Sequence, residues 1–435
     1  FVNGSEQQPQ FVIEMLKSLG ISYVVYSHRG KQDLCGMERS DRFNDTQLQL
    51  IDDADLSDIT TLLDKSTPAH ILNKLEHLGM FVFESSPEVA ELIEQRPRIV
   101  YVKPSTELGV IESDINSGLP SHDKKSEIKC EGIQSSTVAG EFLGKKEYYS
   151  HLELISSRDF DEKNEHEYHP VYTGKNVDCY ILDTGVRHDH PLLENVSTID
   201  NFSSGFSVSG NEDSNQDDNG HGTEIALFIT GKTCGVARDV NILPLKVVSS
   251  RGTGDNIGIA LAINSVIEHH INKETKKPSI INYSLGMMPS PSQPVYYPDE
   301  TGDDVVTLDA LKLATTFGIH VVSAAGNGFG AGSSFQGPMM SKFTNGSMNI
   351  SKELSKNLDP GQGNPIVVGS TDSFSNVYGN ELNVNHMSYF SNYGTGNTLN
   401  APGKSMIIPR YDWEVDTNEI YRWRTGTSFS CPIAV

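Results

Sequence analysis

The sequence has few cysteines, few basic residues and no long hydrophobic run. Its 435 residues include five cysteines, an odd number without a Cys-x-x-Cys pair. We therefore expect neither a disulfide-rich scaffold nor a zinc site. With 34 Lys and Arg against 57 Asp and Glu, the formal net charge is −23, which argues against a nucleic-acid or anionic-membrane partner. No apolar run approaches the ~20 residues that span a bilayer, so we expect no membrane span.

The chain begins at Phe1, so any signal peptide would lie outside the given sequence. Several Asn-x-Ser/Thr sequons are compatible with passage through the secretory pathway, although such sequons are also common by chance. We expect an extracellular or vacuolar protein. The compatible sequons begin at Asn3, Asn44, Asn195, Asn201, Asn345 and Asn349.

The N-terminal part of the chain predicts a small α/β module over residues 21–108. Apolar runs at 21–26, 80–84 and 98–103 favour strands, and the patterns at 68–78 and 87–94 favour helices. Residues 109–147 are rich in Ser, Gly, Glu and Lys without a sustained period, which indicates an exposed linker. The linker carries the pairs Lys124-Lys125 and Lys145-Lys146. Either pair could be a processing site or simply solvated charge.

Residues 148–435 alternate between apolar runs and helical segments. Strands are predicted at 177–182, 242–248, 280–285, 320–325 and 366–368, and helices at 224–229, 257–271 and 308–317. Continuous hydrophobic strands with helical crossovers indicate a parallel sheet covered by helices on both faces. In such sheets the ligand site lies beyond the carboxyl ends of the strands. Asp183, Gly286 and Asn327 each follow or end a strand there, so we expect them to converge at that edge.

Three residues in glycine-rich settings suggest nucleophilic catalysis. Asp183 lies in Asp-Thr-Gly, His221 in His-Gly-Thr and Ser428 in Gly-Thr-Ser, in the chain order Asp, His, Ser. His221 is the natural base for the Ser428 hydroxyl because an imidazole titrates near neutral pH. Asp183 would orient the ring, and Asn327 would supply an oxyanion donor. Taken singly, each residue is more often a cap or a turn former, but their joint order favours a triad.

Other histidines do not suggest a metal site. His188, Asp189 and His190 directly follow the Asp-Thr-Gly motif and fit an exposed turn. His166 and His169 lack the His-Glu-x-x-His register. We therefore assign no metal.

These segments resemble the subtilase family, and within it the fungal proteinase K group. The resemblance runs from His151 to Val435, through Asp-Thr-Gly at 183–185, His-Gly-Thr at 221–223 and Gly-Thr-Ser at 426–428, with matches also at 282–286, 324–327, 390–394 and 401–403. It implies a subtilisin-like fold that acts on protein or peptide substrates as a monomer. It also implies that the substrate backbone pairs with two edge strands and that a third segment walls the first specificity pocket. These substrate-binding residues would be Gly252, Thr253, Gly254, Ser284, Leu285, Gly286, Ala324, Ala325 and Gly326.

The module at 21–108 resembles the family's inhibitory propeptide, a small ferredoxin-like α/β domain, notably at 79–84 and 98–106. The chain's own propeptide would then be its inhibitor, and the linker would be cut during maturation. Val435 lies only seven residues after Ser428, whereas the resemblance implies further elements there. We therefore expect the peptidase domain, 148–435, to be C-terminally incomplete.

The sequence also departs from the family pattern. Glu224 stands where the family usually has a second His, Leu227 where it has Gly, and Cys431 lies in an unusual segment after Ser428. Thr398 lies where relatives can carry an acidic calcium ligand, so we carry over no calcium site and expect no required cofactor. The sequence thus predicts a serine endopeptidase made as a zymogen. The alternative is a catalytically silent subtilase fold that acts as a binding or scaffold protein.

Overall fold

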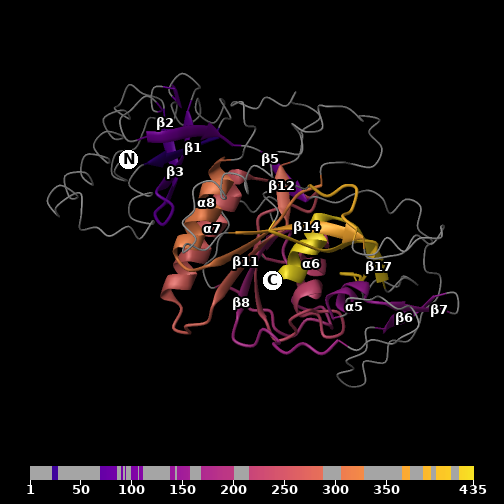
Figure 1. Cartoon of the computed structure of the whole chain (residues 1–435). Helices are drawn as coiled ribbons and strands as arrows, with labels where there is room; N and C mark the ends of the chain where they lie inside the picture. Colours follow the sequence, from indigo (N-terminus) through magenta and orange to yellow (C-terminus); the bar gives the residue numbers. More distant parts are fainter. Residues whose placement is uncertain are drawn as a thin grey trace. The chain divides into compact units, whose positions relative to one another are not determined.

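The computed structural model (Figure 1) describes most of the predicted catalytic region and parts of the N-terminal module. The described residues are 22–27, 69–85, 90–91, 94, 99–105, 107–110, 138–142, 145–156, 168–199, 215–287, 305–327, 365–372, 386–392, 398–412 and 421–435. They belong to two compact units. The first comprises Phe1–Thr106, Asp255–Asn272 and Val305–Phe317, and the second comprises Glu107–Gly254, Lys273–Asp304 and Gly318–Val435.

The first unit contains a four-stranded antiparallel sheet in the order β2-β3-β1-β4. Its strands are β1 (Ser22–Ser27), β2 (Ala69–Leu75), β3 (Met80–Ser85) and β4 (Ile99–Pro104). The unit also contains helices α7 (Asn256–Asn272) and α8 (Val305–Thr316). After the β2 strand, the His77 N–H donates to Asn264 Oδ1 on α7 at 3.0 Å, and the His77 ring packs edge-on against Phe317. The sheet is therefore anchored on residues that lie far along the chain.

Three strands of this module were predicted correctly, but the helix predicted at 68–78 is wrong, because β2 occupies it. The β2–β3 register shifts between Ile71 and Asn73, which marks a bulge. The bulge interrupts the two-residue alternation of a strand, and the remaining spacing of Ile71, Leu75 and Leu78 imitates a helix. Of the helix predicted at 87–94, the structure describes only Ala90, Glu91 and Glu94, which are helical.

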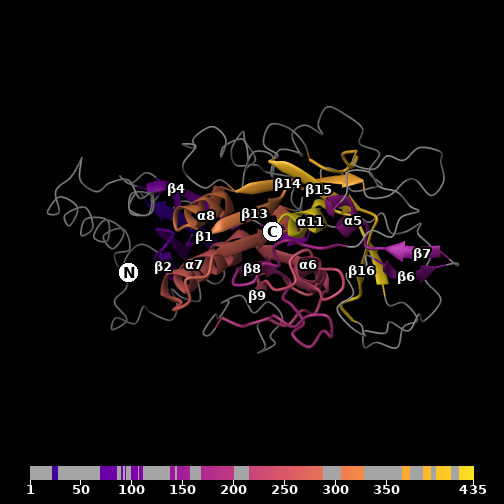
Figure 2. The ribbon, with the colours of Figure 1, turned by 60° about the horizontal axis from the view of Figure 1, so that its bottom comes forward.

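The second unit is built on a six-stranded parallel sheet in the order β15-β14-β13-β11-β8-β9 (Figure 2). All five neighbouring pairs are parallel. The strands are β8 (Asp178–Asp183), β9 (Asn241–Lys246), β11 (Ser279–Tyr283), β13 (His320–Ala324), β14 (Ile366–Asp372) and β15 (Leu399–Lys404). The chain moves from β8 to β9 at one edge, then returns past β8 to β11. The strand order therefore reverses between β8 and β11.

This sheet confirms the predicted parallel α/β architecture and its five predicted strands. The β8 strand is buried at all six positions, as expected of a strand covered on both faces. The missed strand is β15, which contains Pro402 and Gly403. Both residues disfavour strands, but β15 lies at the edge of the sheet, where a proline is tolerated because one side needs no ladder hydrogen bond.

Helix α6 (His221–Thr230) packs on the sheet through an entirely buried surface. Ile225 and Phe228 of α6 belong to one core cluster with Cys179 and Ile181 of β8 and with Ile242 of β9. The same cluster includes residues of α5 (Ser150–Ser156), β16 (Met406–Pro409) and α11 (Thr427–Ser430). The core thus joins α6, which begins at His221, to α11, which carries Ser428.

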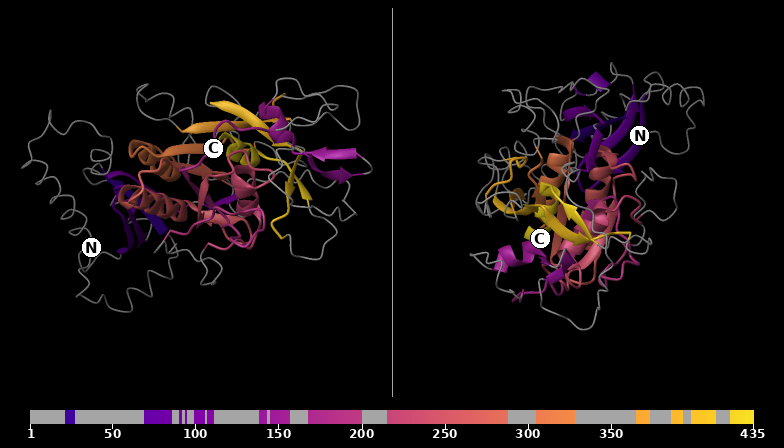
Figure 3. Two further views of the ribbon diagram at one scale, coloured as in Figure 1. Left: turned by 90° about the horizontal axis from the view of Figure 1, so that it is seen from below. Right: turned by 90° about the vertical axis from the view of Figure 1, so that its right-hand side faces the viewer.

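Two hairpins and a small three-stranded sheet complete the second unit. The β6 (Val138–Phe142) and β7 (Lys145–Tyr148) hairpin and the β16–β17 (Tyr421–Arg424) hairpin are antiparallel and appear in magenta and yellow in Figure 3. Strand β5 (Glu107–Val110) lies between β10 (Thr253–Asp255) and β12 (Leu285–Met287).

The linker predicted at 109–147 includes regular strands where it is described. Strand β5 ends in this segment, β6 lies within it and β7 begins in it. They are four or five residues long, too short to show a period in a window of polar residues. The Lys145-Lys146 pair lies in β7, and the Lys124-Lys125 pair lies outside the described residues.

Candidate active site

Asp183 and His221 form a buried pair where the strand order reverses. Asp183 is the last residue of β8, and His221 is the first residue of α6. His221 Nδ1 lies 2.8 Å from Asp183 Oδ1, and both side chains are fully buried. The Thr184 N–H also donates to Asp183 Oδ1, at 2.7 Å. Because a carboxylate only accepts, Nδ1 carries the proton, and this tautomer leaves Nε2 as the basic nitrogen.

The start of α6 is organised by Asp217, which the sequence analysis did not identify. Its carboxylate accepts hydrogen bonds from the N–H groups of Asn219, Gly220 and Thr223 and from the hydroxyls of Thr184 and Thr223. Burial raises the pKa of Asp217, and the hydrogen bonds from Thr223, Gly220 and Asn219 oppose that effect. Because these donors come both from Thr184, which follows β8, and from residues 219–223, Asp217 holds the first turn of α6 against the end of β8. The available signal was an acidic residue just before a predicted helix start.

Gly222 allows α6 to approach β8 closely. A Cβ atom at this position would lie 2.1 Å from Gly185 O and 3.1 Å from the Asp183 Cβ. The Gly222 N–H donates to Thr184 Oγ1 at 2.9 Å. A side chain here would therefore push His221 away from Asp183.

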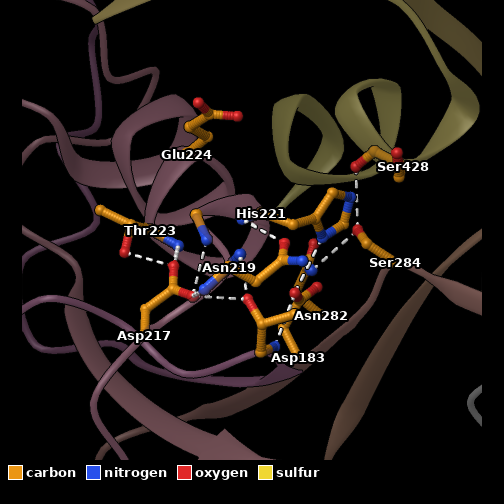
Figure 4. A network of polar contacts seen from close by, with 12 residues as sticks. Asp183, Asp217, Asn219, His221, Thr223, Glu224, Asn282, Ser284 and Ser428 are labelled. Atoms are coloured by element: carbon orange, nitrogen blue, oxygen red, sulfur yellow. Dashed lines mark hydrogen bonds and ion pairs between the residues drawn. The ribbon is translucent and has the colours of Figure 1, made fainter. Parts of the chain in front are cut away.

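Ser428 lies on α11, next to the His221 ring and the end of β11 (Figure 4). Ser284 Oγ donates to the Ser428 carbonyl at 2.9 Å and accepts from Asn282 Nδ2 at 3.0 Å. The Phe429 ring lies 5.2 Å from the His221 ring, measured between centroids. The side chain of Asn282 and the residue that follows β11 thus hold the α11 backbone beside the Asp183–His221 pair.

Asn327 lies directly beside the residue that precedes Ser428. Its Oδ1 accepts from the Thr427 N–H at 2.9 Å and from Thr427 Oγ1 at 2.8 Å. These two bonds orient the amide, so its donor end, Nδ2, faces away from Thr427. Gly326 approaches the same residue, because its N–H donates to Thr427 Oγ1 at 3.1 Å. Ala324 ends β13, and Ala325 and Gly326 follow it, both buried.

The two strands predicted to bind substrate lie on either side of β5. Leu285 and Gly286 belong to β12, and Ser284 directly precedes it. Thr253 and Gly254 belong to β10, which follows Gly252. Strand β5 pairs antiparallel with β12, with Val110 opposite Leu285, Gly109 opposite Gly286 and Leu108 opposite Met287. A segment of the chain itself therefore occupies the space between these strands.

The structure gives no positive support for a metal site. Within the described ranges, no group of three or more His, Cys, Asp or Glu side chains is arranged to hold a metal ion. His190 donates from Nε2 to Arg410 O and accepts from the Leu192 N–H, so its ring organises a loop. Among the helices described, none has the length and apolar character needed to cross a membrane.

Comparisons with known proteins give consistent matches. Residues 174–435 match the subtilase family, peptidase S8. A cuticle-degrading serine protease of Arthrobotrys oligospora is 28% identical over 302 residues, 69% of this chain and 60% of the relative. An extracellular serine proteinase of a Thermus species is 27% identical over 354 residues, 81% of this chain and 63% of the relative. The chain thus spans less than two thirds of either relative's length.

A solved structure of a cold-adapted subtilisin-like serine proteinase also matches. It is 25% identical, with a TM-score of 0.45, and the match covers 65% of this chain and 81% of that one.

Proposed function

Because the chain belongs to the subtilase family, we propose that it is a serine endopeptidase with Asp183, His221 and Ser428 as its catalytic triad. The observation that carries this proposal is the buried Asp183–His221 pair, with 2.8 Å between Oδ1 and Nδ1, beside the α11 segment that bears Ser428. The pair lies at the end of β8, beside the point where the strand order reverses between β8 and β11. Such a point is the usual place for a ligand site in a parallel sheet.

In the proposed reaction, His221 Nε2 takes the proton of Ser428 Oγ as the oxygen attacks the substrate carbonyl carbon. Asp183 accepts from Nδ1 and stabilises the imidazolium that forms. The imidazolium then protonates the leaving amine as the carbon–nitrogen bond breaks, which leaves an acyl-enzyme. A water molecule, deprotonated by the same imidazole, attacks the acyl carbon and releases the carboxylic acid, and the proton returns to Ser428.

Asn327 would stabilise the tetrahedral intermediate. Its Oδ1 is held by two hydrogen bonds from Thr427, so the orientation of its donor end is set before substrate arrives. A preorganised amide of this kind stabilises a developing oxyanion without further reorganisation. Backbone N–H groups beside Ser428 would complete the oxyanion hole.

Substrates would bind as an added strand between β10 and β12. The pairing of β5 with Leu285–Met287 supports this proposal, because it demonstrates that an extended segment fits there. It also supports a zymogen, in which residues up to Val110 exclude substrate until the chain is cut. Because Val110 pairs with Leu285, the carboxyl end of β5 is the end nearest Ser284 and therefore nearest the nucleophile's backbone. We place the maturation cut within a few residues after Val110.

The remaining features follow from the proposed class of enzyme. Its partners would be protein or peptide substrates and its own propeptide, and it would act as a monomer without a required cofactor. A secretory-pathway location agrees with the similarity to a relative described as extracellular. Placement in the fungal proteinase K group and a vacuolar location remain predictions.

Covalent labelling with a fluorophosphonate tests the proposed function. The probe reacts with a serine only where a neighbouring base activates it. Because β5 lies between the proposed substrate strands in the uncut chain, labelling is carried out on protein cut after Val110 with an added protease and then diluted. Cut wild-type protein should be labelled at Ser428, as read by peptide mass spectrometry, and cut Ser428→Ala should not be labelled. Thr425→Ser, which keeps a nearby hydroxyl outside the triad and removes only a methyl group, is the matched control and should be labelled like wild type. Cut and folded wild-type protein that stays unlabelled would favour the silent scaffold.

A further inference from the structure

A buried ion pair connects the helix that begins with His221 to the strand that leads to Ser428. Glu224 lies on α6, three residues after His221 (Figure 4), and Arg424 is the last residue of β17. Arg424 Nε donates to Glu224 Oε2. The Glu224 side chain is 0% exposed and the Arg424 side chain 10%. The residue that departs from the family pattern therefore has a dedicated cationic partner, 200 residues away in the sequence.

The Glu224 carboxylate also belongs to a longer series of charges on the β16–β17 hairpin. Arg422 lies 4.0 Å from Glu224 Oε1 and 3.6 Å from Asp412 Oδ2. Arg410 binds both oxygens of Asp412, at 2.8 and 2.7 Å. These contacts limit the movement of the hairpin end relative to α6. The position of the chain that enters α11 is thereby tied to α6.

Arg424 also touches the nucleophile's own segment. Its guanidinium carbon lies 5.8 Å from the centre of the Phe429 ring, and that ring lies 5.2 Å from the His221 ring. Arg424 precedes Ser428 by four residues. One guanidinium thus contacts α6 through Glu224 and α11 through Phe429, the neighbour of Ser428.

A buried ion pair is weak evidence for stability, because well-packed apolar residues often replace it without loss. What an ion pair adds is direction, since a guanidinium must meet the carboxylate in a defined orientation. We propose that Glu224 and Arg424 are positioning residues that set Ser428 relative to His221. The inference rests on the proposed serine-peptidase function. It gives a role to Glu224, which otherwise favoured a silent fold.

The rate of fluorophosphonate labelling per folded molecule, measured on protein cut after Val110, tests this inference. Glu224→Gln keeps the shape of the side chain but removes its charge, and it should slow labelling of Ser428 at least tenfold. With a peptide substrate, kcat should fall while KM changes little, because the contacts described above join the pair to α6 and α11, which carry His221 and Ser428. The matched control is Asp178→Asn, which breaks a buried ion pair with Lys273 at the opposite end of β8, 2.8 Å between Nζ and Oδ2. It should lower the thermal midpoint but change the labelling rate less than twofold.

A double variant, Glu224→Leu with Arg424→Met, separates positioning from folding. It removes both charges together, so it should recover most of the thermal stability that Glu224→Gln loses. Its labelling of Ser428 should nevertheless stay at least tenfold slower than that of the wild type. Wild-type labelling in the double variant, or in folded Glu224→Gln, would overturn the inference while leaving the proposed function intact. If Glu224→Gln does not fold, the double variant decides alone. Wild-type protein that is cut after Val110 but stays unlabelled would instead refute the proposed function.

Discussion

Asp217→Asn is the change that most directly perturbs the frame of the proposed site. In the wild type, Oδ1 accepts from Thr184 Oγ1 at 2.9 Å, from the Asn219 N–H at 3.0 Å and from the Gly220 N–H at 2.8 Å. Oδ2 accepts from the Thr223 N–H at 2.9 Å and from Thr223 Oγ1 at 2.6 Å. The carboxylate receives five donors, whereas an amide offers one accepting oxygen and one NH₂ group.

The magnitude follows from counting these bonds. If the amide oxygen keeps the three donors of Oδ1, its NH₂ group faces the Thr223 N–H, which loses its acceptor. An unsatisfied buried donor costs about 1–3 kcal/mol. The Thr223 hydroxyl can rotate to accept, but the other bonds lose their charge assistance, which roughly halves each of them. Removing a buried charge returns part of this loss, since burial raises the pKa of Asp217. We expect a net loss of about 2–4 kcal/mol of unfolding free energy.

Urea unfolding at pH 7 measures this loss, and labelling at Ser428 measures its effect on the site. Labelling should slow, because the same carboxylate holds the first turn of α6, which begins with His221. Asp239→Asn, an exposed carboxylate in the same unit, is the control and should change stability by less than about 0.5 kcal/mol. A loss below about 1 kcal/mol for Asp217→Asn, together with wild-type labelling, would refute our account of Asp217.

Three further outcomes are expected. Asn327→Ala should lower kcat by about 10²–10³ with little change in KM, in steady-state assays where chemistry limits the rate; an unchanged kcat would contradict its oxyanion role. Burial lowers the pKa of His151 to about 4, so the folded state resists protonation of the ring. The free energy of unfolding is therefore unaffected by this ring above its unfolded pKa of about 6.5, and it falls by up to about 3 kcal/mol as the pH drops to 4. Urea titrations of wild type and His151→Gln should diverge over this interval, and parallel curves would speak against it. N-terminal sequencing of the mature form should find a new terminus within a few residues after Val110, and a cut near His151 alone would disprove that placement.

Much of the second unit could be predicted because its strands are continuous apolar runs. Tyr180, Ile181 and Leu182 of β8 are completely buried, and such runs are readable without knowledge of their neighbours. Strand β15 could not be predicted in this way, because Pro402 and Gly403 favour turns. These residues are tolerated in a strand here because β15 lies at the edge of the sheet. The β2 strand was misread because a bulge broke its alternation.

The motifs of the candidate site could be predicted from the sequence, but the long-range contacts around them could not. Asp183 and His221 were found because each sits in a short glycine-containing motif next to a strand or helix boundary. Arg424, by contrast, meets Glu224 across 200 residues of sequence, and neither residue carries a local pattern that names its partner. The pairing of β5 with β12 likewise could not be derived from the residues alone, because strand pairing is a non-local property.

The place of β5 between β10 and β12 also has a consequence for competition. A segment tethered to its own binding strands acts at an effective concentration on the order of millimolar, whatever the dilution of the protein. Free peptides would have to exceed that concentration, or bind much more tightly, to displace it. Once the tether is cut, the same segment competes only at its bulk concentration, so simple dilution would open the cleft.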